Sequence, residues 1–326
     1  MLKLLRAFAA SISILILTSL SHGADVPPAW AYPINPPNLR AAPDDGKPKR
    51  VPNSTVELTR AQITGRGAPV ADWHPEEHPP MPDIVGKPRL VAPNSQLLSC
   101  GYCHLPNGAG RPENASLAGL TPGYFKQQVL AFRNGERPGS EPTRAPQTNM
   151  IAIVKAMNDA EIDQAAAYFA AIKPASFMKV IEADTVPKTT VAGWMLTKAP
   201  DGGTEPIGNR IIEIADDFER FEHRDSRTPY TVYVPRGSLK KGADLVNTPA
   251  PSKTLQCAIC HGPEFKGLAD IPRLAGRSPS YLMRQLYDIK AGTRNSAQTV
   301  LMKAVVANLT EDDMLAVSAY LASREP

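Results

Sequence analysis

Every cysteine in the chain belongs to one of two copies of the same short motif. In each copy, two residues separate a pair of cysteines and a histidine follows directly, as Cys100-Gly101-Tyr102-Cys103-His104 and Cys257-Ala258-Ile259-Cys260-His261. This is the attachment signature of c-type haem, in which both thiols form thioethers and the histidine is the proximal ligand of the iron. The sequence therefore predicts two haem c groups, one at Cys100, Cys103 and His104 and one at Cys257, Cys260 and His261.

Two other kinds of chemistry use paired cysteines. Four thiolates can hold a structural zinc ion, and a single Cys-x-x-Cys pair can act as a thiol redox centre. Structural zinc sites place their two pairs about 15 to 20 residues apart, whereas 157 positions separate Cys100 from Cys257. Neither alternative accounts for a histidine directly after both pairs, so haem attachment is the favoured interpretation.

Residues 1–24 have the layout of a secretory signal peptide. They contain Lys3 and Arg6, then an apolar run, then small residues. Because haem c is attached outside the cytoplasm, we expect a periplasmic protein, with an uncleaved N-terminal anchor as the alternative. No later stretch approaches the roughly 18 apolar residues of a membrane span. Removing Lys3 and Arg6 lowers the formal charge from +4 to +2, which gives no reason to expect a nucleic acid partner.

The two motifs belong to a longer internal repeat. A shift of 157 positions superposes identical residues in the two copies, and from Met150 onward the shift becomes 152. The matched pairs include Leu117/Leu274, Gly119/Gly276, Tyr124/Tyr281, Gln128/Gln285, Gly135/Gly292, Arg137/Arg294, Met150/Met302 and Tyr168/Tyr320. The repeat predicts two similar domains, over residues 86–174 and 237–326.

Each copy contains the same signals for the ends of helices: an N-cap followed by proline, a terminating glycine and a capping box. In order along the chain they are Thr121-Pro122, Gly135, Asn158 with Glu161, Ser278-Pro279, Gly292, and Thr310 with Asp313. A short helix is also expected before each motif, over residues 86–91 and 242–246. The repeat therefore predicts a mainly α fold.

Two regions lie outside the repeat. Residues 25–85 are rich in proline, which favours an irregular, extended segment. Its aromatic residues Trp30, Tyr32 and Trp73 indicate that parts of this segment pack on a domain. Residues 175–236 contain β-branched runs bounded by glycine and proline, so we expect a partly β central insert with a few short strands.

Met150 and Met302 are the predicted sixth ligands of the two irons. They follow His104 and His261 by 46 and 41 residues, and we expect both in the loop before the last helix of their copy. A thioether favours ferrous iron, so His/Met ligation raises the reduction potential. The rival ligands are His74, His78 and His223, all of which lie outside the repeat.

Other methionines are interpreted as packing residues. Met157 precedes a capping box and forms a hydrophobic staple with Ile162, and Leu309 does the same with Met314. Met283 is matched by Lys126 in the other copy, which indicates a peripheral position.

Two arginines and one backbone carbonyl are further candidates to support the haems. A haem-ligating histidine donates its other ring N–H to a carbonyl. Arg137 and Arg294 are candidates to pair with haem propionates, since a guanidinium fork suits a carboxylate, although either could be an exposed side chain.

The second copy resembles one domain of the diheme class I cytochromes c of the c-four type. The resemblance rests on the motif at Cys257, the run Pro272-Arg273-Leu274-Ala275-Gly276, Tyr281, Gln285, and Met302 before Asn308 to Asp313. It implies that the Pro272 carbonyl accepts the hydrogen bond from His261. The first copy is similar but carries Ala115 at the matching position and Pro112 three residues earlier, so it departs from the pattern.

The resemblance implies two helical class I domains in tandem and electron transfer in the periplasm. The predicted function is a carrier of single electrons between a redox donor and acceptor such as a dehydrogenase, a respiratory complex or a terminal oxidase, with no catalytic residues. Two alternatives stay open. The chain could be the electron-transfer subunit of a periplasmic dehydrogenase, or a peroxidase-like diheme enzyme with one open iron, which would need a vacant axial position.

Overall fold

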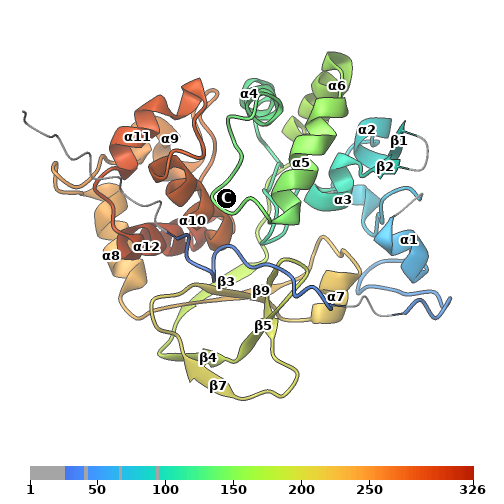
Figure 1. Cartoon of the computed structure of the whole chain (residues 1–326), viewed down its shortest axis with the longest axis horizontal. Helices are drawn as coiled ribbons and strands as arrows, with labels where there is room; N and C mark the ends of the chain where they lie inside the picture. The colour runs from blue at the N-terminus through green and yellow to red at the C-terminus, as the bar shows by residue number, and fades with distance from the viewer. Residues whose placement is uncertain (1–25, 40–42, 66–67, 93–94) are drawn as a thin grey trace, which may run out of the picture.

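Two helical units lie side by side, with a layer of β-strands beneath both (Figure 1). The computed structural model describes residues 26–39, 43–65, 68–92 and 95–326, so the predicted signal peptide lies outside the described residues. The chain is mainly α with a smaller β part, as the sequence predicts.

The first helical unit contains the first motif. Its helices are α3 (Cys100–His104), α4 (Pro122–Arg133), α5 (Ala145–Ala156) and α6 (Asp159–Ala170). The helix expected over residues 86–91 is wrong. The chain there forms α2 (Asp83–Gly86), β1 (Arg89–Ala92) and β2 (Ser95–Leu97). Lys87 is extended, with φ −121° and ψ 133°, because Pro88 disfavours a helical conformation in the residue before it.

The second helical unit contains the second motif. It consists of α8 (Ser238–Asn247), α9 (Ala258–His261), η2 (Pro263–Phe265), α10 (Pro279–Lys290), η3 (Ala297–Thr299), α11 (Val300–Val306) and α12 (Glu311–Ala322). The helix expected before this motif is confirmed, and α8 extends it in both directions. Helices α8 and α12 pack closely against each other.

The helix boundaries read from the sequence are confirmed. The Thr121 and Ser278 side chains cap α4 and α10 by accepting from the backbone N–H three residues later, each at 3.2 Å. Both helices end before a glycine with positive φ. Capping boxes begin α6 at Asn158 and α12 at Thr310, and each stabilises its helix by satisfying two end groups.

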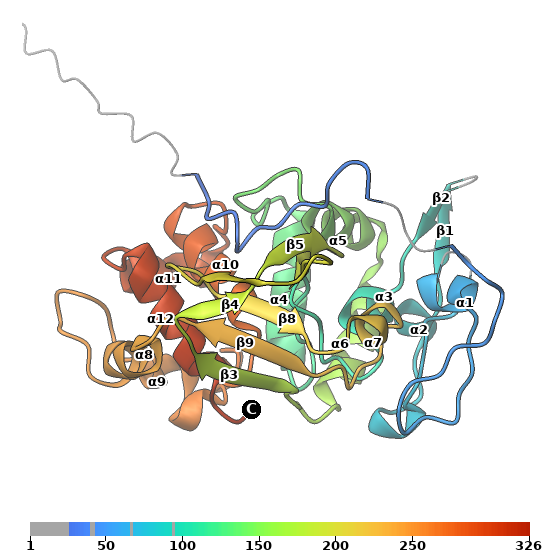
Figure 2. The ribbon, with the colours of Figure 1, turned by 90° about the horizontal axis from the view of Figure 1, so that it is seen from below.

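The described residues of the central insert form one three-stranded sheet and two two-stranded sheets. The strands are β3 (Met178–Glu182), β4 (Thr185–Pro187), β5 (Thr189–Ala192), β6 (Met195–Lys198), β7 (Thr204–Pro206), β8 (Ile212–Ala215) and β9 (Tyr230–Val234). The sheet order is β3-β9-β8, with β3 parallel and β8 antiparallel to β9, while β4 pairs with β7 and β5 with β6. Figure 2 shows this layer from below, and its buried Val232 and Val234 pack against Leu315 of α12. A short helix, α7 (Phe218–Glu222), connects β8 to β9.

The proline-rich segment before the first unit is largely irregular. Within its described residues it contains α1 (Arg60–Thr64), the 3₁₀ turn η1 (Pro75–Glu77), and α2. Its aromatic residues pack as expected. The buried Tyr32 hydroxyl donates to Asp288 Oδ1 of α10 at 2.7 Å, and the buried Trp73 Nε1 donates to the His223 carbonyl at 2.7 Å. This segment therefore packs on the second helical unit through Tyr32 and on the central insert through Trp73.

The methionines are not all placed as the sequence indicates. Met157 and Met314 are buried core residues beside their capping boxes, as expected. Met283 is fully buried, so its predicted peripheral position is wrong. Ala31 and Tyr32 of the proline-rich segment join Met283 in one core cluster, whereas its counterpart Lys126 forms an ion pair with Asp163 at the surface.

The described residues contain neither a membrane-spanning helix nor a cluster of metal-binding side chains. No helix there is long and apolar enough to cross a membrane. No group of three or more His, Cys, Asp and Glu side chains there has the arrangement of a metal site.

Candidate haem sites

The first motif forms its own short helix, α3, and directs His104 into the interior. The His104 Nδ1 lies 2.7 Å from the Ala115 carbonyl oxygen, which can only accept, so Nδ1 carries the proton. Burial lowers the pKa of His104 and favours the neutral ring. A neutral imidazole with a protonated Nδ1 keeps the Nε2 lone pair free for a metal.

The second motif repeats this arrangement. His261 Nδ1 donates to the Pro272 carbonyl at 2.8 Å, and burial lowers the pKa of this ring as well. The departure expected at Ala115 does not change the geometry, because the acceptor is a backbone carbonyl that any residue supplies. The Pro112 carbonyl instead accepts from Arg284 Nη2 at 2.6 Å.

A cavity of about 1120 Å³, partly open to solvent, lies beside the first motif. Cofactor pockets are mostly apolar with a few placed polar groups, and the lining of this cavity has the same character. Cys100, Cys103, His104 and Met150 all border it. Its apolar walls come from Leu117, Leu120, Phe125, Val129, Phe132 and Ile153. The cavity brings together every residue predicted to bind the first haem.

Four arginines border the same cavity, and two of them come from the second helical unit. They are Arg137, Arg144, Arg277 and Arg284. Buried nitrogens at Arg144 Nε, Arg277 Nη2 and Gln128 Nε2 have no hydrogen-bond partner among the described residues. Unpartnered buried donors are costly, and two propionate carboxylates would satisfy them. The residues present therefore fit a haem, and arginines of both helical units would hold its propionates.

Arg137 and Arg294 meet at the contact between the two units. Gln128 Oε1 accepts from Arg137 Nη1 and Arg294 Nη2, each at 2.9 Å. Gln285 Oε1 accepts from Arg137 Nη2 at 2.8 Å and from Arg294 Nη1 at 3.1 Å. Both arginines are buried, so the alternative of exposed side chains is wrong. Burial, with the nearby Arg294 charge, lowers the pKa of Arg137 to about 10, which leaves it charged at neutral pH.

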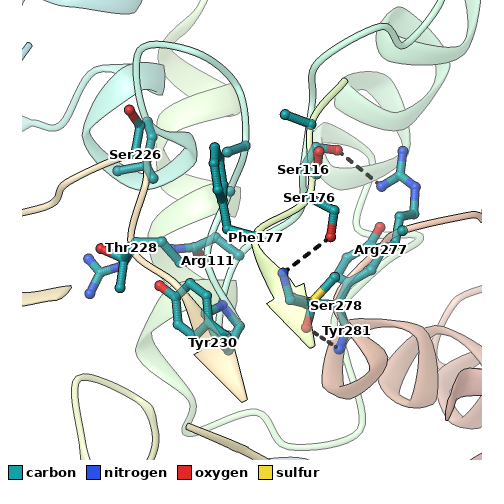
Figure 3. A pocket seen from close by; sticks show the side chains of 18 of the residues that line it. Arg111, Ser116, Ser176, Phe177, Ser226, Thr228, Tyr230, Arg277, Ser278 and Tyr281 are labelled. Atoms are coloured by element: carbon teal, nitrogen blue, oxygen red, sulfur yellow. Dashed lines mark hydrogen bonds between the residues drawn. The ribbon is translucent and has the colours of Figure 1, made fainter. Parts of the chain in front are cut away.

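A second cavity of about 530 Å³ lies where the first unit, the insert and the second unit meet (Figure 3). Arg277 borders both cavities. Its Nη1 donates to the Ser116 carbonyl at 3.0 Å, while Nη2 is the unpartnered nitrogen described above. Ser278 begins α10 at the edge of this cavity and also donates to Glu213 Oε2 at 2.7 Å. Arg277 therefore links the second cavity to the group of arginines that borders the first.

The two predicted methionine ligands lie in helices rather than in the expected loop. Met150 is in α5 and Met302 is in α11. Met150 borders the first cavity and packs on the core of its unit, and Met302 is partly buried against the core cluster of α10 and α12. The length difference between the copies falls before these helices and leaves the methionines equivalent.

The rival histidines have other partners, and none borders the first cavity. His74 Nε2 lies 3.2 Å from Asp225 Oδ1, and His78 Nε2 lies 3.1 Å from Asp72 Oδ1. His223 is also buried, under Trp73. Burial raises the pKa of Cys100 to about 12 and that of Cys257 to about 11, which disfavours the thiolate that a redox pair needs at these two positions.

Several residues at these sites were missed by sequence analysis. The repeat does match four of them between the copies, as Tyr124/Tyr281 and Gln128/Gln285. Identical polar residues on one helix face were a signal of shared function. Arg144, Arg277 and Arg284 gave no such signal. Ser296 and Leu120 occupy the places that match Arg144 and Arg277.

Each of the two sites has a histidine with a free Nε2, a neighbouring pair of cysteines and a methionine at the equivalent position. These features define a protein of the c-type haem class with two sites. Comparison of the chain with known proteins leads to the same class. A model of the family described as cytochrome c matches residues 239–325. Cytochrome c-552 of Acidithiobacillus ferridurans is 32% identical over 242 residues, which cover 73% of this chain and 79% of that protein.

Two further relatives are 26% identical. One is cytochrome c4 of Azotobacter vinelandii, over 68% of this chain and 82% of the relative. The other is described as a thiosulfate dehydrogenase electron acceptor of Stutzerimonas stutzeri, over 71% of this chain and 81% of the relative. The chain belongs to the cytochrome c family, and several of its relatives are described as cytochrome c4. It binds two haem c groups and functions in electron transfer, as the sequence predicts.

Proposed function

We propose that the chain is a periplasmic electron carrier whose two irons are both closed by His/Met ligation. Cys100 and Cys103 hold the first haem covalently, and Cys257 and Cys260 hold the second. His104 with Met150 and His261 with Met302 are the axial pairs, within haem domains at residues 86–174 and 237–326. When bound, haem c supplies reversible one-electron redox chemistry at its iron.

The first cavity is the observation that carries this proposal. It is bordered by the two thiols, the imidazole and the thioether of one predicted site at once. His104 is fixed by the Ala115 carbonyl, and apolar side chains form most of the cavity walls. The buried arginines that border the cavity would offset the charge of the haem propionates. Nothing in this arrangement requires a catalytic acid or base.

The test uses the methionine ligands. Each of M150A and M302A is expected to remove about half of the weak far-red band that methionine-ligated ferric haem c gives, since each variant opens one of two irons. M157A is the matched control, because Met157 is a core residue beside the first site and its loss should leave the band intact. Prompt binding of carbon monoxide to one reduced haem of the native protein would contradict two closed sites and favour the peroxidase-like enzyme.

A second candidate is the electron-transfer subunit of a periplasmic dehydrogenase. The relative described as a thiosulfate dehydrogenase electron acceptor favours it. In this case the donor would be a dehydrogenase and the acceptor a respiratory complex or terminal oxidase. Purification of the tagged chain from its native periplasm distinguishes the two: a dehydrogenase that co-purifies in fixed ratio supports the subunit, and a chain that elutes alone supports the free carrier.

A further inference from the structure

The outward surface of each haem motif can be compared residue by residue, because the repeat aligns the two copies. We define the motif face by four positions, which are Leu98, Tyr102, Arg111 and Asn114 in the first copy and Leu255, Ile259, Leu268 and Ile271 in the second. The last two positions of each set form the same isolated β-bridge. The backbone of the two faces is therefore alike, and differences between them come from side chains and coverage.

The chain itself covers the first motif face. The Arg224 guanidinium, which follows α7, lies 3.6 Å from the centre of the Tyr102 ring and donates to the Tyr102 carbonyl. The Arg111 guanidinium lies 3.7 Å from the centre of the Phe221 ring. Both contacts are made with the central insert. Arg111 is consequently only 8% exposed.

The proline-rich segment completes this cover. Gly65, at the end of α1, approaches the Tyr102 ring so closely that an added Cβ would lie 2.6 Å from it. The Val85 carbonyl of α2 approaches Gly101 so closely that a Cβ there would lie 2.8 Å from the oxygen. The second copy has Ala258 at this position, partly buried against the core of its own unit. The two regions outside the repeat thus meet over the first motif.

The second motif face is uncovered and aliphatic. Leu255, Ile259, Leu268 and Ile271 are 55%, 67%, 55% and 37% exposed. Val300 and Leu301, just before the ligand candidate Met302, are 59% and 78% exposed. The matching residues of the first copy are the polar Thr148 and Asn149. Thr254 Oγ1 donates to the Val305 carbonyl at 2.8 Å, so the segment that carries Leu255 lies against α11, the helix of Val300 and Leu301.

We propose that the motif face of the second copy, together with Val300 and Leu301, is the docking surface for a redox protein with an apolar surface of its own, and that the first motif face is closed to such partners. This inference rests on the proposed function. Clustered exposed apolar residues mark interaction sites in soluble proteins. Here the same face in the other copy is covered by polypeptide, which shows that the backbone at this face accepts a protein surface.

The size of the surface selects the kind of occupant. Stable interfaces use about 20–30 residues on each side, and weak electron-transfer encounters use fewer. Six partly exposed side chains fit the second class, so the occupant is a transient redox partner rather than a second copy of this chain. Exposed Cys260 lies within the same surface. A partner seated here would therefore contact the covalent edge of the second haem.

The test compares I259K/L301K with L130K, which places a lysine at a residue of α4 that is 43% exposed and outside both motif faces. The probe is a purified single-haem cytochrome c whose haem edge is surrounded by apolar side chains, mixed with the holoprotein in a stopped-flow instrument. I259K/L301K is expected to slow electron exchange about tenfold, because burying a lysine charge in an apolar contact is unfavourable. A tenfold change corresponds to about 1.4 kcal/mol. L130K should match the wild type, and oxidation by ferricyanide should be unchanged in all variants.

Footprinting by hydroxyl radicals gives a readout that does not depend on turnover. The probe protein should protect Ile259 and Leu301 from labelling and leave residues 143–149 unprotected. Equal rates for I259K/L301K and the wild type would overturn the proposal, as would equal slowing by L130K. A wild-type dimer that I259K/L301K converts to a monomer in sedimentation equilibrium would overturn the choice of occupant. If the far-red band is absent from the wild type, the proposed function fails instead, whatever these rates are.

Discussion

Lys241 Nζ of α8 lies 2.7 Å from Asp313 Oδ1, in the first turn of α12. Lys253 contacts the other carboxylate oxygen, and the same Asp313 closes the capping box with Thr310. Its side chain is only 5% exposed. Asp313 therefore connects three segments of the second helical unit through a single buried carboxylate.

This arrangement predicts a large effect of D313N at neutral pH. Burial raises the pKa of Asp313, but hydrogen bonds from Lys241 and Lys253 outweigh it and hold that pKa below its usual range. A carboxyl with a lower pKa in the folded state contributes stability above its unfolded pKa of roughly 3.9 and loses it as pH falls toward the folded pKa. D313N should cost about 1–3 kcal/mol at pH 7 and progressively less below pH 4, measured by urea unfolding.

The control for this prediction is D244N. Asp244 forms an ion pair with Lys240 in which both side chains are more than half exposed, and such pairs contribute about 0–1 kcal/mol. If D244N and D313N cost the same, or if the cost of D313N does not depend on pH, the buried carboxylate is not the connection described here.

For Glu213 we expect the opposite dependence of stability on pH. It is 3% exposed on β8 and accepts from Ser278 Oγ at 2.7 Å and the Ser280 N–H at 3.3 Å. Burial raises the pKa of Glu213. A carboxyl with a raised folded pKa contributes its full stability below the unfolded pKa and loses it as pH rises through the folded value. E213Q keeps an acceptor oxygen, so it should match the wild type near pH 4 and become the more stable protein as pH increases.

Urea unfolding at several pH values tests this directly. A constant difference between E213Q and the wild type from pH 4 to pH 8 would show that Glu213 does not take up a proton on folding. A wild type that gains stability over E213Q with rising pH would show that the carboxylate is the favoured form.

The local features of this fold could be predicted from the sequence because their determinants are local. A cap, a capping box or a terminating glycine depends on a few neighbouring residues, and those at Thr121, Asn158, Ser278 and Thr310 are where the sequence places them. The expected helix before the first motif failed for a local reason as well, since Pro88 was visible in the sequence.

Features that depend on distant segments could not be predicted. Comparison with Lys126 gave the wrong environment for Met283, because the proline-rich segment covers α10 and not the equivalent face of α4. Arg277 borders the first cavity from the other helical unit, and a repeat that treats each unit separately contains no information on their contact. The environments of matching residues in the two helical units therefore differ where the regions outside the repeat pack against them.

We predict that replacing Arg137 shifts the midpoint potential of the first haem. It is a buried cation at the cavity of that haem. A nearby positive charge favours the reduced, less positive iron, so R137M should lower the midpoint potential of the first haem by on the order of 59 mV, a tenfold change for one electron. Potentiometric titration of the two haems measures it.

R236M is the matched control for that change. Arg236 is 67% exposed in its ion pair with Asp184, so its removal alters the net charge equally but far from any buried site. Equal shifts in R137M and R236M would mean that net charge alone sets the potential, and an unchanged potential in R137M would remove Arg137 from the haem environment.

The crossing of α8 and α12 predicts that Gly242 cannot be replaced. An added Cβ there would lie 2.1 Å from the Ala316 carbonyl oxygen and 2.7 Å from Tyr320 Cβ, so G242A must separate the two helices. Overpacking of this kind costs about 1–3 kcal/mol. G292A is the comparison, because Gly292 has a φ of +78° and nothing within 4 Å of an added Cβ, so only backbone strain of about 1–2 kcal/mol opposes it. Hydrogen exchange separates the two cases: G242A should accelerate exchange along α8 and α12 together, whereas G292A should affect the end of α10. Accelerated exchange confined to α10 in both variants would show that the close approach of α8 and α12 does not determine the stability of this unit.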